Sequence, residues 1–145
     1  MKANEKIINR RKELNLTSVE VACDSGLTIH EYDDIEDYED EIISVVPLSS
    51  VKALCRVLSI DIYDLLDLSP DEINTRTFSY SGSVLLRRSR QEKGLSQEQL
   101  SDMIGIHCWS IKEIESDVKN LDKWVIVDVM LLAKALGIPV TLLLS

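Results

Sequence analysis

The sequence contains few of the residues that build disulfide frameworks, metal sites and disordered chains. Among its 145 residues are 3 cysteines, 3 prolines, 5 glycines and 2 histidines. Cys23, Cys55 and Cys108 lie far apart and form no CxxC pair, which argues against a disulfide framework and a cysteine-based zinc site. The scarcity of proline and glycine argues against low-complexity, collagen-like or wholly disordered sequence.

Long apolar stretches are also absent from the sequence. No run approaches the roughly 20 apolar residues that a membrane-spanning helix needs. The N-terminal stretch MKANEKIINRRK lacks the apolar segment of a signal peptide. We therefore expect no membrane association and a cytoplasmic location.

Recognisable catalytic and metal-binding patterns are missing as well. His30 and His107 lie far apart, and neither has a nucleophile motif beside it or a second metal ligand at helical spacing. The acidic run 31–41 lacks the alternating Asp/Asn pattern and the central glycine of a calcium loop. We expect no enzymatic activity, no metal and no cofactor.

Acidic residues are concentrated in the first half of the chain. The formal net charge is −9; residues 1–70 hold 7 basic and 15 acidic residues, whereas residues 71–145 hold 9 and 10. Eight of the eleven residues from Glu31 to Glu41 are acidic. Because charges act mainly on whatever approaches the surface that carries them, the two halves should suit different partners.

The chain repeats itself. A shift of 79 residues aligns 10–36 with 89–115, with six identities that include Arg11 with Arg90 and Glu36 with Glu115. A shift of 78 residues aligns 48–66 with 126–144, with six more identities. Two copies of one unit explain this best. We assign residues 1–68 to the first copy, 69–82 to a linker and 83–145 to the second copy.

Both copies are predicted to be helical. In the second copy Ser96 and Gln99 predict a capping box, and Gly105 predicts the end of that helix. The segment 125–137 is apolar nearly all round, which predicts a buried helix. In the first copy we expect helices near 4–14, 18–25, 28–37, 48–58 and 61–67. Residues 74–82 fit either a polar linker or an extended segment.

The second copy has the spacing of a helix-turn-helix. Counted from Gln97, the fifth residue is the small Ser101 and the ninth is Gly105, with apolar residues at positions four, eight, fifteen and eighteen. This pattern resembles the lambda-repressor-like (Cro-type, XRE) family. The resemblance implies an all-α chain of two tandem five-helix domains, whose third helix enters the DNA major groove. It also implies two ion pairs between the first and third helices, Arg11 with Glu36 and Arg90 with Glu115.

The resemblance also implies which residues of the second copy face DNA. They are Gln97, His107, Cys108, Trp109 and Lys112, with Arg87, Arg88, Lys119, Asn120 and Lys123 near phosphates. Two alternatives stay open: Trp109 packs inward against Trp124, and the charged residues form only a solvated helix surface.

The first copy departs from the family pattern. Its eighth position is Ser25 and its fifteenth is Tyr32, and residues 28–37 contain five carboxylates and no Lys or Arg. Because phosphate neutralisation by cations supplies much of DNA affinity, we expect this copy to have lost groove binding. Its candidate partner surface comprises Glu31, Asp33, Asp34, Asp37, Glu39 and Asp40.

Two functions follow as hypotheses. The first is a homodimeric transcriptional regulator that binds double-stranded DNA through the second copy, with the first copy as a dimerisation or protein-contact module. The second is a protein-binding module of the immunity-protein, antitoxin or antirepressor type, which keeps the fold but binds a basic protein partner instead of DNA.

Overall fold

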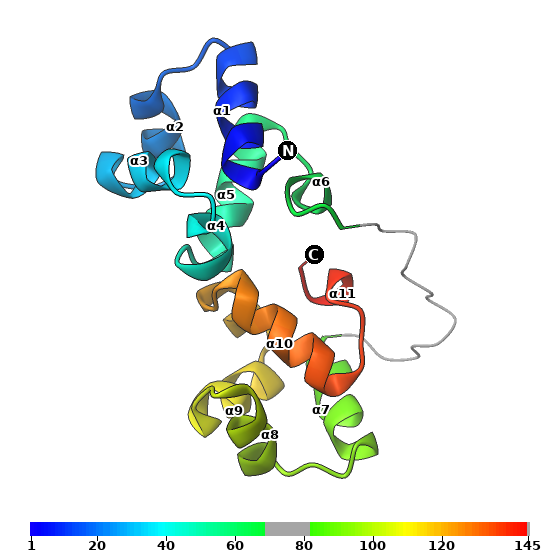
Figure 1. Cartoon of the computed structure of the whole chain (residues 1–145). Coiled ribbons are helices and arrows are strands. Elements are labelled where there is room, and N and C mark those ends of the chain that lie inside the picture. The colour runs from blue at the N-terminus through cyan, green and yellow to red at the C-terminus, as the bar shows by residue number, and fades with distance from the viewer. Residues whose placement is uncertain (69–81, 145) are drawn as a thin grey trace. The chain divides into compact units, whose positions relative to one another are not determined.

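The computed structural model describes residues 1–68 and 82–144 (Figure 1). These described residues form helices joined by turns and loops, and contain no β-strand. The expected all-α class is therefore confirmed. The chain divides into two compact units, Met1–Ser69 (unit 1) and Pro70–Ser145 (unit 2).

Unit 1 contains one short helix that the sequence did not predict. Its helices are α1 (Ala3–Glu13), α2 (Ser18–Asp24), α3 (Ile29–Asp37), α4 (Glu41–Ser44), α5 (Leu48–Leu58) and α6 (Ile62–Leu65). The unexpected helix is α4, a single turn that is too short to show a helical period in the sequence. The expected ends of the other helices agree within a few residues.

Unit 2 follows a similar order of helices. They are α7 (Gly82–Glu92), α8 (Gln97–Ile104), α9 (Cys108–Ser116), the 3₁₀ helix η2 (Val118–Lys123), α10 (Ile126–Leu136) and α11 (Thr141–Leu144). The predicted linker 69–82, with the extended segment considered at 74–82, lies outside the described residues except for Gly82. Gly82 is the first residue of α7.

Each unit has its own apolar core. In unit 1 the buried residues include Ile7, Val21, Tyr32, Ile35, Val51, Leu54 and Leu58. In unit 2 they include Leu86, Leu100, Ile104, Ile111, Ile114, Val129, Leu132 and Leu136. Burial of these side chains is the main favourable contribution to the stability of each unit.

The segment 125–137, which the sequence predicts as a buried helix, contains α10, and most residues of this helix are buried or half-buried. In α10 the residues Ile126, Val129 and Leu132 face the core, whereas Leu131 remains 42% exposed. An amphipathic helix needs only one apolar stripe to pack, and the apolar residues outside that stripe are accessible.

Candidate nucleic-acid interface

Helix α8 begins with the predicted capping box. The side chain of Ser96 accepts a hydrogen bond from the Gln99 backbone N–H at 3.0 Å, and Gln99 Oε1 accepts one from the Ser96 N–H at 2.8 Å. Two N–H groups that the helix leaves unpaired are thus satisfied. The start of α8 is therefore fixed by local sequence.

The turn between α8 and α9 depends on two small residues. Gly105 has φ +69°, in the left-handed region that only glycine occupies without steric cost. The hydroxyl of Ser101 donates a hydrogen bond to the carbonyl oxygen of Ile106. Ser101 is therefore more than a small residue at the helix crossing, because it also closes the turn. Leu100 and Ile104 on α8 and Ile111 and Ile114 on α9 are buried and hold the two helices together.

A buried ion pair joins α7 to α9. The guanidinium of Arg90 donates from Nε and Nη2 to the two carboxylate oxygens of Glu115, each at 2.9 Å. Its Nη1 donates to the carbonyl oxygen of Leu95 at 2.8 Å. The hydrogen bonds that Arg90 donates to Glu115 raise the pKa of Arg90 above its ordinary value. This bidentate contact fixes where α9 lies relative to the rest of unit 2.

The first turn of α9 carries a capped backbone and an exposed tryptophan. His107 is the N-cap residue, and its Nδ1 accepts a hydrogen bond from the Trp109 backbone N–H at 3.1 Å. The Trp109 side chain is 67% exposed, so it does not pack inward. The Nζ of Lys112 lies 5.4 Å from the centroid of the indole ring, within cation–π range. Trp124, the other tryptophan, is buried.

Several of the other predicted DNA contacts are accessible to solvent. The exposed ones are Arg87, Arg88, Lys119 and Lys123, whereas Gln97 and Cys108 are half-buried. Two of the predicted contacts also bond to α9 itself: Arg87 Nη2 donates to the Glu115 carbonyl at 3.2 Å, and Asn120 Nδ2 donates to the Glu113 carbonyl at 2.9 Å.

Carboxylates lie among these cations. Glu113 Oε2 is 3.8 Å from Lys123 Nζ, and Glu98 Oε1 is 3.8 Å from Cys108 Sγ. The Lys123–Glu113 pair is exposed to solvent, and such pairs contribute little energy. A phosphate can therefore compete for Lys123. The surface around α9 is mixed in charge, and it is not a uniformly basic strip.

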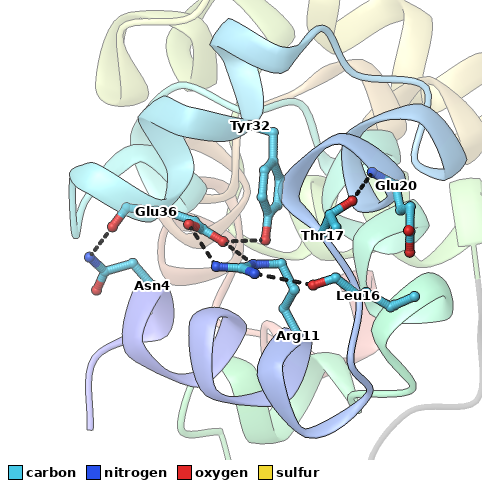
Figure 2. Close-up of polar contacts among 7 residues, drawn as sticks. All are labelled: Asn4, Arg11, Leu16, Thr17, Glu20, Tyr32 and Glu36. Carbon is cyan, nitrogen blue, oxygen red and sulfur yellow. Dashed lines mark hydrogen bonds and ion pairs between the residues drawn. The ribbon is translucent and has the colours of Figure 1, made fainter.

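Unit 1 has an equivalent ion pair, with an additional partner (Figure 2). Arg11 Nε donates to Glu36 Oε1 at 2.6 Å, and Arg11 Nη1 donates to the Leu16 carbonyl at 3.1 Å. The buried Tyr32 donates its hydroxyl hydrogen to Glu36 Oε1 at 2.7 Å. Burial, with the hydrogen bond to Glu36, raises the pKa of Tyr32. The tyrosine that departs from the family pattern is thus accommodated by the ion pair, and this contact was not predicted.

The surface of α3 is strongly acidic. All six carboxylates of the candidate partner surface are exposed: Glu31, Asp33, Asp34, Asp37, Glu39 and Asp40. Two have local partners: Glu31 accepts the Thr28 backbone N–H at 2.9 Å, and Glu39 lies 2.5 Å from Lys2 Nζ. The hydrogen bond from the Thr28 backbone lowers the pKa of Glu31.

Ser25 occupies the position in unit 1 that matches Ile104 in unit 2. It is buried, and its hydroxyl oxygen has no hydrogen-bond partner among the residues that the structure describes. A buried hydroxyl without a partner is unfavourable, so this departure from the family pattern weakens the packing of α2.

These features of unit 2 agree with a comparison against known protein families. Residues 86–143 match the helix-turn-helix family model. This helix-turn-helix domain spans α8, its turn and α9, together with most of α7 and the helices that follow. No curated protein and no solved structure matches the chain significantly.

The described part of the chain offers neither a cluster of metal ligands nor a membrane-spanning helix. Within residues 1–68 and 82–144, no group of three or more His, Cys, Asp or Glu side chains is placed to hold a metal ion. None of the helices in these ranges is long and apolar enough to cross a membrane.

Proposed function

We propose that the chain is a transcriptional regulator that inserts α9 of the helix-turn-helix domain into the DNA major groove. The observation that carries the proposal is the accessible face of α9. Opposite the buried Ile111 and Ile114, this face presents Trp109 and Lys112, with Glu113 as its exposed carboxylate. Side chains at the start of a recognition helix contact base edges in helix-turn-helix proteins.

We propose that unit 1 is a second, degenerate copy of the same domain that does not enter the groove. Left-handed backbone recurs at matching places in the two units, at Asn15 and Gly94, Gly26 and Gly105, and Ser59 and Gly137. The Arg–Glu pairs recur as well, at 2.6 Å in unit 1 and 2.9 Å in unit 2. The carboxylates of α3 would be repelled by phosphates. A dimerisation or protein-contact role suits unit 1 better, and two copies of the chain would then place two α9 helices on one DNA site.

The test is enrichment of a sequence from a genomic DNA pool by the full chain, followed by measurement of affinity against salt concentration. We expect log K to fall with log[salt], because phosphate contacts release counterions. Lys112→Ala should weaken binding and reduce the salt slope by about 1 if Lys112 contacts a phosphate. Lys134→Ala removes an exposed cation from α10 and is the matched control, which should leave the slope unchanged. Failure to enrich any sequence at low salt would refute the proposal.

A second candidate function is capture of a basic protein by unit 1. It is favoured by a pocket of about 90 Å³ that combines apolar and acidic lining residues: Leu27, Val45, Pro47, Glu31, Asp34 and Glu41. Burial raises the pKa of Glu41, and the neighbouring Asp34 and Asp40 raise it further. A Lys or Arg side chain suits such a pocket, because its aliphatic stem can contact the apolar wall while its charge offsets the carboxylates.

This second function is tested by purification from native lysate at low salt. It predicts a stoichiometric basic partner that dissociates at high salt. The triple variant Asp33→Asn, Asp34→Asn and Asp37→Asn should weaken that complex. The matched control neutralises three exposed carboxylates elsewhere, Glu20, Asp24 and Glu92. Equal affinity of the two variants would contradict this function.

A further inference from the structure

Trp109 is the most conspicuous side chain that the helix-turn-helix fold leaves without a structural role. It exposes 67% of its surface, more than the other large exposed apolar residues that the structure describes in unit 2, Val84, Met103 and Leu131. The fold does not need this indole, because Ile111 and Ile114 on the same helix supply the packing. An exposed tryptophan at the start of α9 is therefore available for a contact outside the chain.

Trp109 has a backbone contact and a ring contact within unit 2. The Trp109 backbone N–H is held by the imidazole of His107, which fixes the first turn of α9. The ammonium of Lys112 lies over the ring at 5.4 Å. Because the ammonium covers one side of the ring, a partner would contact the part of the ring that the ammonium leaves uncovered. Trp109 and Lys112 thus present an apolar ring next to a cation.

The chemistry of the major groove offers one partner for such a ring. The C5-methyl of thymine is the apolar group that base pairs present there, and it lies beside the O4 acceptor of the same base. The indole N–H is a donor without an acceptor function. We propose that Trp109 reads a thymine, with the ring against the 5-methyl group and Lys112 directed to a neighbouring guanine or phosphate. This proposal rests on the proposed function, because it requires α9 to lie in the major groove.

The test replaces each thymine of an enriched DNA site by deoxyuridine, one position at a time. This change removes a methyl group and keeps the base pairing. Loss of one buried methyl predicts a drop in affinity of about fourfold at one position of a half-site. A symmetric pair of such positions predicts a drop of roughly sixteenfold. The full chain is used, and affinity is measured at one fixed salt concentration.

Variants assign the effect to Trp109. Trp109→Ala should bind thymine and deoxyuridine sites equally, whereas Trp109→Phe keeps an apolar ring and should retain part of the discrimination. Met103→Ala removes another exposed apolar side chain of the same unit and should discriminate as the unchanged protein does. Because Trp109 is exposed, far-UV circular dichroism should give the same spectrum for all variants.

The outcomes separate this proposal from the proposed function. If the chain binds DNA with a salt slope that Lys112→Ala reduces, but no thymine position is sensitive to deoxyuridine, the thymine proposal is overturned and the regulator remains. The same conclusion follows if Trp109→Ala retains the thymine preference. If the chain enriches no DNA sequence, both proposals are overturned.

Discussion

The buried ion pair of unit 2 gives the sharpest test of what holds α9 in place. The perturbation is Glu115→Gln, which keeps the shape of the side chain and removes its charge. Glu115 is only 5% exposed and accepts two hydrogen bonds from Arg90 at 2.9 Å. After the substitution the largely buried Arg90 loses its paired carboxylate and keeps only the weaker attraction of Glu98.

The magnitude follows from this burial. Removing one member of a buried pair costs about 3–5 kcal/mol, and we expect about 3 kcal/mol because glutamine can still accept one hydrogen bond from Arg90. A domain of this size has a free energy of unfolding of roughly 4–11 kcal/mol. With a urea dependence of about 1–1.5 kcal/mol per M, the unfolding midpoint should fall by roughly 2–3 M.

The two tryptophans make the assay specific to unit 2. Trp109 and Trp124 are the only tryptophans in the sequence, and both lie in this unit. Trp124 is buried, so its fluorescence should change when unit 2 unfolds. Urea titration followed by tryptophan fluorescence therefore measures the affected unit without a contribution from unit 1.

Glu113→Gln is the matched control for this experiment. It makes the same chemical change on the same helix, but the Glu113 side chain is 50% exposed and lies 3.8 Å from Lys123. We expect the free energy of unfolding to change by less than about 0.5 kcal/mol. Equal midpoints for Glu115→Gln and the unchanged protein would refute the assignment of the Arg90–Glu115 pair as the contact that fixes α9.

Three further predictions concern single residues of the two units. Ser25→Ala should stabilise unit 1 by about 1 kcal/mol in urea titration followed by far-UV circular dichroism, because it removes a buried hydroxyl that has no partner within the described parts of the chain; destabilisation would contradict this. The pKa of Tyr32 is raised in the folded state, so the contribution of Tyr32 to stability is complete below pH 10. This contribution is lost as the pH rises from 10 towards the folded-state pKa of Tyr32. Tyr32→Phe should therefore reduce the loss of stability at alkaline pH in a pH series of such titrations. Gly105→Ala should destabilise unit 2 by about 1–2 kcal/mol in the fluorescence assay, because φ is +69°, a backbone conformation that alanine adopts only at a cost. The added methyl would meet no atom within 4 Å, so a steric clash does not contribute. An unchanged midpoint would show that the left-handed backbone carries no cost.

Most of the fold could be predicted because its determinants are local. The capping box of Ser96 and Gln99, the glycine at position 105 and the inward pair Ile111 and Ile114 are each recognisable within a few residues. Such determinants fix the start, the end and the buried face of a helix. The single-turn α4 was missed because four residues contain no helical period.

The parts of the candidate site that were not predicted depend on contacts across space. The sequence does not tell whether Trp109 packs against Trp124 or stands in solvent, since either orientation fits its place on α9. His107 was predicted to face DNA, but its role as the N-cap of α9 was not predicted. The hydrogen bond from Tyr32 to Glu36 was also not predicted. The two residues lie four apart on α3, and this spacing permits the contact but does not require it.

The central claim is that α9 contacts DNA and α3 does not. It is tested most directly by backbone amide NMR spectra of the full chain, recorded as an enriched DNA duplex is added. The account predicts that the signals of Gln97 and of residues 108–112 shift with the duplex concentration, while those of residues 31–37 stay in place. Shifts confined to residues 31–37, or an unchanged α9 in a sample that binds the duplex, would contradict it.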